Sequence, residues 1–217
     1  MQMTRRIVLT SALASLVGSA PTAAQEPFPT LPLRVSVAEV DGTRVVDDAW
    51  IAERVHWANR IFEPAGVSVE VHEIVALDER HARLESRAHR HALGGRMADD
   101  VINVFVVASL RDVDDPTRLR MGVHWRPRGF PGAHLVIVSQ TAGETVLAHE
   151  LGHFFGNRQH SETPGNIMSY DRGDGAPFFD EAQIDIIRRF ARRFLRTGEL
   201  RPLARAAGAT TRASGSM

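Results

Sequence analysis

The chain contains no cysteine and no lysine, and Tyr170 is its only tyrosine. The absence of cysteine excludes disulfide bonds, thiolate metal ligands and cysteine nucleophiles, so any metal must be held by His, Asp, Glu or water. Basic and acidic residues number 26 each, and this balance gives no reason to expect nucleic acid or an anionic membrane as a partner. The ten histidines are therefore the first candidates for chemistry.

The N-terminus has the pattern of an export signal. Arg5 and Arg6 precede an apolar stretch that Pro21 ends, and small residues follow up to Ala24. The stretch is short for a membrane span, so we expect residues 1–24 to be a signal peptide of a secreted or periplasmic protein, with an uncleaved anchor as the alternative. No later apolar stretch is long enough to span a bilayer, and we expect no stable membrane association.

The rest of the chain suits one domain, because 217 residues with an apolar fraction of 43% allow a sizeable core. We expect a proline-rich leader over residues 25–32 and a folded domain over residues 33–196. Residues 197–217 are rich in Ala, Gly, Thr and Ser, which favours a disordered tail. We expect the protein to be a monomer.

Hydrophobic periodicity predicts the order of helices and strands. Strands are expected at residues 33–40, 67–75, 101–110, 121–125 and 134–139, and helices at about 48–62, 141–155 and 179–195. The polar segment 78–96 is at best weakly helical, and 111–120 is a charged loop. This order predicts an α/β domain with a mixed, mostly parallel, twisted sheet of about five strands, the helix at 141–155 packed on it and a C-terminal helix.

The expected helix over residues 141–155 carries the pattern H-E-x-x-H. His149 and His153 lie one turn apart on the same helix face, so their imidazoles can converge on one Zn²⁺ at about 2.0–2.1 Å. Glu150 projects toward the open side of that metal, where it can take a proton from water and later donate it to a leaving amine. Two unrelated histidines on a surface helix are the alternative. The apolar neighbours favour a buried helix, in which such polar groups need partners.

The residues after this helix offer a third ligand. Gly156 can adopt the left-handed conformation that ends a helix, which returns the chain toward the metal. His160 follows four residues later, and the segment from Asn166 to Tyr170 contains Met168. These motifs together resemble the metzincin clan of zinc endopeptidases (matrixin-, astacin- and serralysin-like), in a small, secreted bacterial form.

The resemblance implies a fold, a cofactor and residue roles. It implies Zn²⁺ held by His149, His153 and His160, with Glu150 as catalytic base and an apolar floor formed by Met168. Tyr170 is implied as a catalytic stabiliser of the tetrahedral intermediate, with a packing role as the alternative. The edge strand expected at residues 121–125 could accept a substrate peptide as a further strand.

One spacing departs from the clan. The third histidine usually comes three residues after the glycine, where this chain has Gln159, and His160 is one residue further. A one-residue loop insertion explains the difference. Glu181, which with Asp185 resembles the thermolysin-like spacing, is the rival third ligand. We favour His160, because the glycine stop and the methionine segment belong to the metzincin pattern.

The sequence thus predicts a secreted zinc-dependent endopeptidase that acts on a peptide or protein substrate. A zinc-bearing binding or toxin-like module that no longer cleaves is one alternative, although such a module would not need Glu150. A zinc hydrolase of a non-peptide amide, such as a cell-wall bond, is another. Asp112, Asp114 and Asp115 could hold Ca²⁺, but a plain acidic loop is favoured.

Overall fold

The structure is a computed structural model that describes residues 28–203. The expected signal peptide, residues 1–24, and residues 204–217 of the expected tail lie outside the described residues. The strands are β1 (Leu31–Val40), β2 (Thr43–Arg44), β3 (Val69–Leu77), β4 (Arg83–Leu84), β5 (Ile102–Val107), β6 (Ser109–Leu110), β7 (Gly122–Trp125) and β8 (Leu135–Ser139). The helices are α1 (Asp48–Phe62), α2 (Arg87–Ala92), α3 (Val146–Phe154) and α4 (Glu181–Thr197), with short 3₁₀ turns at Glu63–Ala65, Glu79–His81 and Leu93–Arg96.

The main sheet is mixed and mostly parallel, as the sequence predicted. β1 lies between β3 and β5 and is parallel to both, and β8 continues the sheet parallel to β5. β7 is antiparallel to β8 and forms the edge of the sheet. β2 forms a hairpin with β1 through Asp41 and Gly42, both with positive φ, and β4 pairs with β6 in a small separate sheet.

Both faces of the central strands are buried. In β5, Val104 and Val106 belong to the core beneath the helices, whereas Phe105 and Val107 belong to a second core on the opposite face. β8 alternates in the same way. This two-sided burial explains why these strands read as continuous apolar runs, because successive side chains of a strand point to opposite faces.

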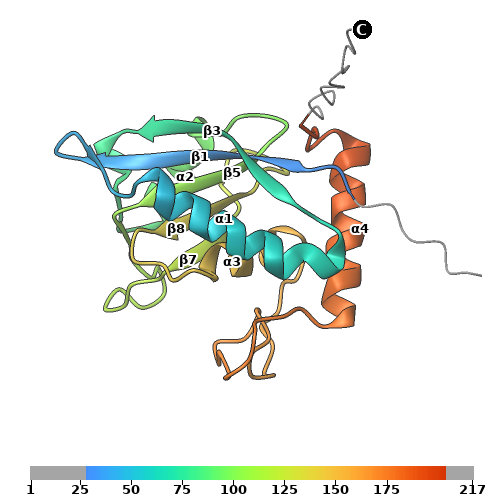
Figure 1. The fold of residues 1–217 in the computed structure, drawn as a ribbon. Coiled ribbons are helices and arrows are strands. Elements are labelled where there is room, and N and C mark those ends of the chain that lie inside the picture. The colour runs from blue at the N-terminus through green and yellow to red at the C-terminus, as the bar shows by residue number, and fades with distance from the viewer. Residues whose placement is uncertain (1–27, 204–217) are drawn as a thin grey trace, which may run out of the picture.

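Helices α1 and α3 lie together on one face of the sheet, and α4 stands at its end (Figure 1). α1 begins where the sequence predicted, since the Asp47 carboxylate accepts a hydrogen bond from the backbone N–H of Trp50 at 2.8 Å. Phe62 at its end packs against Phe155 and Phe179, with ring centroids 5.6 and 4.9 Å apart. These aromatic contacts fix α1 against the segments that flank the candidate site.

Some element boundaries differ from the predictions. The helix expected from Thr141 begins only at Val146. The segment before it forms two turns, in which the backbone N–H of Ala142 donates to the Ser139 carbonyl and that of Val146 donates to the Gly143 carbonyl. The single strand expected over 101–110 is divided into β5 and β6. The weakly helical segment 78–96 contains α2, which the Ser86 hydroxyl caps by accepting from a backbone N–H.

The packed region extends further at both ends than the predicted domain, residues 33–196. β1 begins at Leu31, inside the expected leader. After α4, Leu200 is 1% exposed in the main core, and the backbone N–H of Leu203 donates to the Thr30 carbonyl at 3.2 Å. We expected a disordered tail from Thr197, but residues 198–203 pack on the fold, so the predicted boundary lies too early in the chain. Within residues 28–203, no helix is long and apolar enough for a membrane span.

Candidate metal centre

Helix α3 presents the histidines and then stops at a glycine. Gly156 has φ +97°, its N–H donates to the His153 carbonyl at 3.0 Å, and the N–H of Asn157 donates to the Gly152 carbonyl at 3.0 Å. This is a Schellman ending, which satisfies the last carbonyls of the helix. A Cβ at Gly156 would lie 2.4 Å from the Phe190 ring, so both conformation and space require glycine here.

The end of α3 at Gly156 allows the chain to bring a third imidazole, that of His160, next to the helix. One ligand atom from each of His149, His153 and His160 lies within 4.8 Å of the others. The three rings form a triangle with centroid separations of 4.8, 5.0 and 5.3 Å. His149 is buried, His153 is half-buried and His160 is exposed, so the cluster opens toward solvent on one side.

Backbone carbonyls fix the orientation of the two helix histidines. His149 Nδ1–H donates to the Ile167 carbonyl at 2.7 Å, and His153 Nδ1–H donates to the Asn157 carbonyl at 2.6 Å. A proton on Nδ1 leaves the Nε2 lone pair free for a metal ion. Burial, above all, lowers the pKa of His149 to about 4 and also lowers the pKa of His153, which keeps both rings neutral near pH 7.

Glu150 lines the same cleft as these imidazoles and is buried, with 5% of its surface exposed. Burial raises its pKa to about 8, while a hydrogen bond from the backbone of His124 acts in the opposite direction. Positive charge beside a carboxyl lowers its pKa, so a divalent cation at the histidines would favour the carboxylate form of Glu150. The side chain is thus placed in an environment that favours proton transfer.

Edge strand β7 passes close to Glu150. A Cβ on Gly122 would lie 2.8 Å from the Glu150 side chain and 2.7 Å from Val146 Cγ1. Two residues on, His124 Nε2 lies 2.8 Å from His134 Nδ1, and His134 Nε2 lies 2.8 Å from Glu199 Oε1. This chain of contacts anchors the wall of the site to the turn after α4.

The methionine segment lies directly beneath α3. A Cβ on Gly152 would lie 2.6 Å from Met168 Sδ, so the helix and the methionine can touch only because residue 152 is glycine. Asn166 holds the turn: its Oδ1 accepts from the backbone N–H of Met168 at 2.9 Å, and its Nδ2 donates to Gln183 of α4 at 2.8 Å. Met168 is fully buried, in keeping with an apolar floor.

Tyr170 lies at the open side of the cluster. It is 67% exposed, and its ring centroid is 4.4 Å from that of His160. Arg120, which donates to Asp112 at 2.7 Å, lines the same cleft as Tyr170. The phenol is thus positioned beside a candidate ligand, in a cleft that also contains this positive charge.

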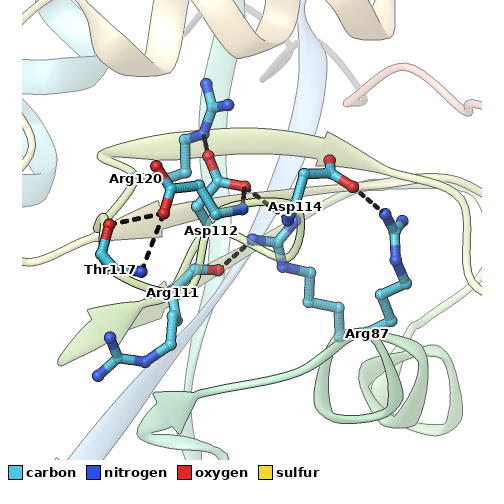
Figure 2. A network of polar contacts seen from close by, with 8 residues as sticks. Arg87, Arg111, Asp112, Asp114, Thr117 and Arg120 are labelled. Atoms are coloured by element: carbon cyan, nitrogen blue, oxygen red, sulfur yellow. Dashed lines mark hydrogen bonds and ion pairs between the residues drawn. The ribbon is translucent and has the colours of Figure 1, made fainter.

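The acidic loop, residues 111–120, precedes β7, and arginines and backbone amides hold its carboxylates. Asp112 accepts from the backbone N–H of Asp114 at 2.9 Å and from Arg120 Nε at 2.7 Å, while Asp114 pairs with Arg87 (Figure 2). The amide of Asp114, above all, lowers the pKa of Asp112 to about 2. The carboxylates of this loop are therefore engaged in holding its shape.

Neither the acidic loop nor Glu181 forms an alternative centre. In the described part of the chain, the three histidines are the only set of three or more His, Asp or Glu side chains placed to hold one ion. Glu181 lies in the first turn of α4, whose Asp180 and Gln183 form a capping box. The geometry therefore favours His160 over Glu181 as the third candidate ligand.

The centre forms the floor of an open cleft of about 810 Å³. Its walls include β7, the acidic loop and Tyr170. Gly122 and His124 lie in the edge strand that the sequence predicted, but their contacts with Glu150 and His134 were not predicted. The place of Arg120 in this wall was not predicted either.

Comparison with known proteins supports the fold. No family profile matches the chain, and no curated protein matches it in sequence. Among solved structures, mirolysin in complex with a compound matches with a TM-score of 0.57 and 12% identity, over 81% of this chain and 100% of that chain. Archaemetzincin from Methanopyrus kandleri matches with a TM-score of 0.52 and 17% identity, over 76% of this chain and 97% of that chain.

A third solved structure, metalloproteinase-II from Bacteroides fragilis, matches with a TM-score of 0.51 and 16% identity. The match covers 79% of this chain and 55% of that chain, so the chain spans about half the length of this relative. At these identities the likeness concerns the fold. The chain therefore has a metzincin-type metalloprotease fold that carries a cluster of three histidines, which confirms the resemblance predicted from its sequence.

Proposed function

We propose that the protein is a zinc-dependent endopeptidase whose catalytic base is Glu150. The observation that carries the proposal is a buried carboxyl that lines the same open cleft as a cluster of three imidazoles. A binding module would have no need to bury an acid next to its metal ligands, because burial of a carboxyl without a chemical task is costly.

The residues fit a zinc ion. Three neutral imidazoles converge within 4.8 Å, two of them are oriented by backbone carbonyls, and the cluster is open on one side. This donor set, with one position left for water or substrate, is typical of catalytic rather than structural zinc. When bound, Zn²⁺ would supply Lewis-acid polarisation of the scissile carbonyl and would make water more acidic.

Glu150 would carry the proton through the reaction. As a carboxylate it accepts one proton from the attacking water, whose oxygen forms the new bond to the carbonyl carbon. As the C–N bond breaks, the same carboxyl donates this proton to the departing nitrogen, so the base is regenerated. The Tyr170 hydroxyl, beside His160, would donate a hydrogen bond to the developing oxyanion.

Strand β7 would hold the substrate. In the described residues it pairs only with β8, so its other edge can accept an extended peptide as an added strand. Gly122 brings that edge next to Glu150, which would place a peptide bond near the carboxyl.

The test compares Glu150→Gln with a matched control, Glu144→Gln, at an exposed position shortly before α3. We expect the zinc-loaded protein and the control to degrade a denatured protein substrate, and Glu150→Gln to bind zinc but lose at least about a hundredfold in rate. Full activity of Glu150→Gln would refute the mechanism. Zinc binding without cleavage of any peptide would favour the non-catalytic module, and cleavage of a non-peptide amide alone would favour the other hydrolase.

We also propose that the protein is exported, on the basis of its N-terminal sequence. N-terminal sequencing of protein recovered outside the cytoplasm should begin at Gln25. Recovery of the intact N-terminus in the cytoplasm would refute this.

A further inference from the structure

Positive charge predominates in the cleft around the histidines. Arginines that line it number seven, against three acidic residues, although basic and acidic residues balance at 26 each over the chain. The excess is therefore a property of this surface and does not follow from the composition.

The three acids leave most of this charge unbalanced. Asp112 pairs with Arg120, and Asp114 pairs with Arg87. The third acid, Glu150, is buried beside the histidines. The pairs with the acidic loop thus account for only two of the seven arginines.

Four of the remaining arginines are exposed and form no ion pair with a carboxylate anywhere in residues 28–203. Arg118 precedes β7 and Arg126 follows it directly, so they flank the edge strand at its two ends. Arg158 precedes His160 by two residues and Arg172 follows Tyr170 by two, on the segments that bear those side chains.

The four arginines line the same cleft as the three histidines and Glu150. They therefore lie close enough to influence a charged group that occupies the cleft.

A peptide that pairs antiparallel with β7 would pass between these arginines. Its N-terminal part would run toward Arg126 and its C-terminal part toward Arg118. Four residues of β7 span about 13 Å. Carboxylates two or three residues away from the bond opposite Glu150, on either side, would therefore come within reach of a guanidinium.

We propose that the substrate of this centre is an acidic peptide segment, with Asp or Glu on both sides of the bond that is cut. The proposal rests on the proposed peptidase function and adds its specificity. Guanidinium groups bind carboxylates through paired hydrogen bonds. Each exposed pair is expected to improve kcat/KM about two- to fivefold, and the summed field also attracts an anionic peptide from solution.

The experiment uses three peptides that share one scissile sequence, taken from a bond that the zinc-loaded protein cuts in a denatured protein. They carry Glu, Gln or Lys at the second and third positions on both sides. We expect kcat/KM for the Glu peptide to exceed that for the Gln peptide about tenfold, and the Lys peptide to be slower still. The advantage should shrink in 0.5 M salt, because exposed charges are screened.

Charge reversal identifies the arginines. Arg126→Glu combined with Arg172→Glu should lower the ratio of kcat/KM between the Glu and Lys peptides at least tenfold. The matched control is Arg83→Glu, an exposed position in β4 outside the cleft, which should leave this ratio unchanged. An equal fall in the control would overturn the assignment to the cleft.

Failure of the inference differs from failure of the proposed function. Equal kcat/KM for the three peptides would overturn the acidic specificity and leave the peptidase intact. If the zinc-loaded protein cuts no bond in any denatured protein, the proposed function itself fails, and the specificity with it.

Discussion

Gly122 in the edge strand and Glu150 in α3 approach so closely that a methyl group on the glycine would overlap the carboxyl. A Cβ there would lie 2.8 Å from both Cγ and Oε1 of Glu150. Real Cβ atoms essentially never come so near, so any side chain at this position must displace either the strand or the acid. The distance between β7 and the Glu150 carboxyl is therefore set by the absence of a side chain at residue 122.

Replacing Gly122 with alanine should damage activity more than stability. Displacement of reacting groups by about 1 Å can cost up to a hundredfold in rate, and we expect Gly122→Ala to lower kcat/KM at least about tenfold. Gly95→Ala is the control, since a Cβ there meets nothing within 4 Å. Steady-state kinetics on one peptide, with thermal unfolding of each variant, provides the measurement. Unchanged kcat/KM in Gly122→Ala would show that strand and acid can separate freely.

Gly152→Ala should destabilise the fold, although alanine normally favours a helix over glycine by about 1 kcal/mol. The new Cβ would lie 2.6 Å from Met168 Sδ and 3.1 Å from the Phe179 ring. Overpacking of this kind costs about 1–3 kcal/mol, so we expect a net loss in the free energy of unfolding, measured by urea denaturation. Adding Met168→Ala should restore part of the loss, and the absence of such coupling would contradict the contact.

Two of the candidate ligands, His149 and His153, could be predicted from the sequence because a single helix fixes how they lie relative to each other. Helical periodicity alone places His149 and His153 on one face, and a glycine stop after them is visible in the sequence. The position of His160 was less certain, because its spacing departs from the family pattern. The loop after the Schellman ending brings its ring to within 5.0 Å of His153, between ring centroids, and so absorbs the extra residue.

The edge strand of the cleft was predicted, but the contacts of its residues could not be, because they join segments that are distant in the sequence. Gly122 matters only where β7 crosses α3, and His124 only where it reaches His134 and Glu199. Some predicted helix and strand boundaries were wrong for a similar reason. β6 separates from β5 because Ser109 pairs with Arg83 of β4, a partner that periodicity does not reveal.

His160 should be needed for zinc and Glu181 should not. We expect about one zinc per chain in the parent protein, a marked loss in His160→Ala, and retention in Glu181→Gln. Metal analysis after dialysis against a weak chelator provides the measurement. His89→Ala, which changes an exposed histidine of α2, is the control. Zinc kept by His160→Ala and lost from Glu181→Gln would transfer the third ligand to α4.

Acid should destabilise the metal-free protein through His124. Burial, above all, lowers its pKa to about 3 from the ordinary value of 6.5. Between these values the unfolded chain binds more protons than the folded one, so stability falls as the pH drops from 6.5 toward 3. The loss is at most about 1.4 kcal/mol per pH unit for one group.

The measurement for His124 is urea denaturation at pH 7.5, 5.5 and 4.5 in the presence of a chelator. His124→Gln keeps a hydrogen-bonding side chain but does not titrate, so it should lose less stability over this range than the parent. Parallel pH profiles for the two proteins would contradict the role of His124.

Tyr170→Phe should lower kcat with little change in KM, because the hydroxyl is expected to bind the oxyanion only as it forms. The side chain is 67% exposed, so we expect about a tenfold effect, below that of a fully buried donor. The parent and Tyr170→Phe are compared on the same peptide, and zinc content is checked in both. Equal kcat values would leave Tyr170 as a packing neighbour of His160.

The hydrogen bond from Leu203 to Thr30 places the first and last described segments side by side, where β1 begins and the turn after α4 ends (Figure 1). The backbone therefore nearly closes on itself, and α3 and β7 lie far from the two ends of the described chain. A short linker could join these two segments while a new opening is cut elsewhere, such as at the exposed Asp41–Gly42 turn. Such a circular permutant would keep every contact of the candidate metal centre, since neither change touches α3, β7 or the methionine segment.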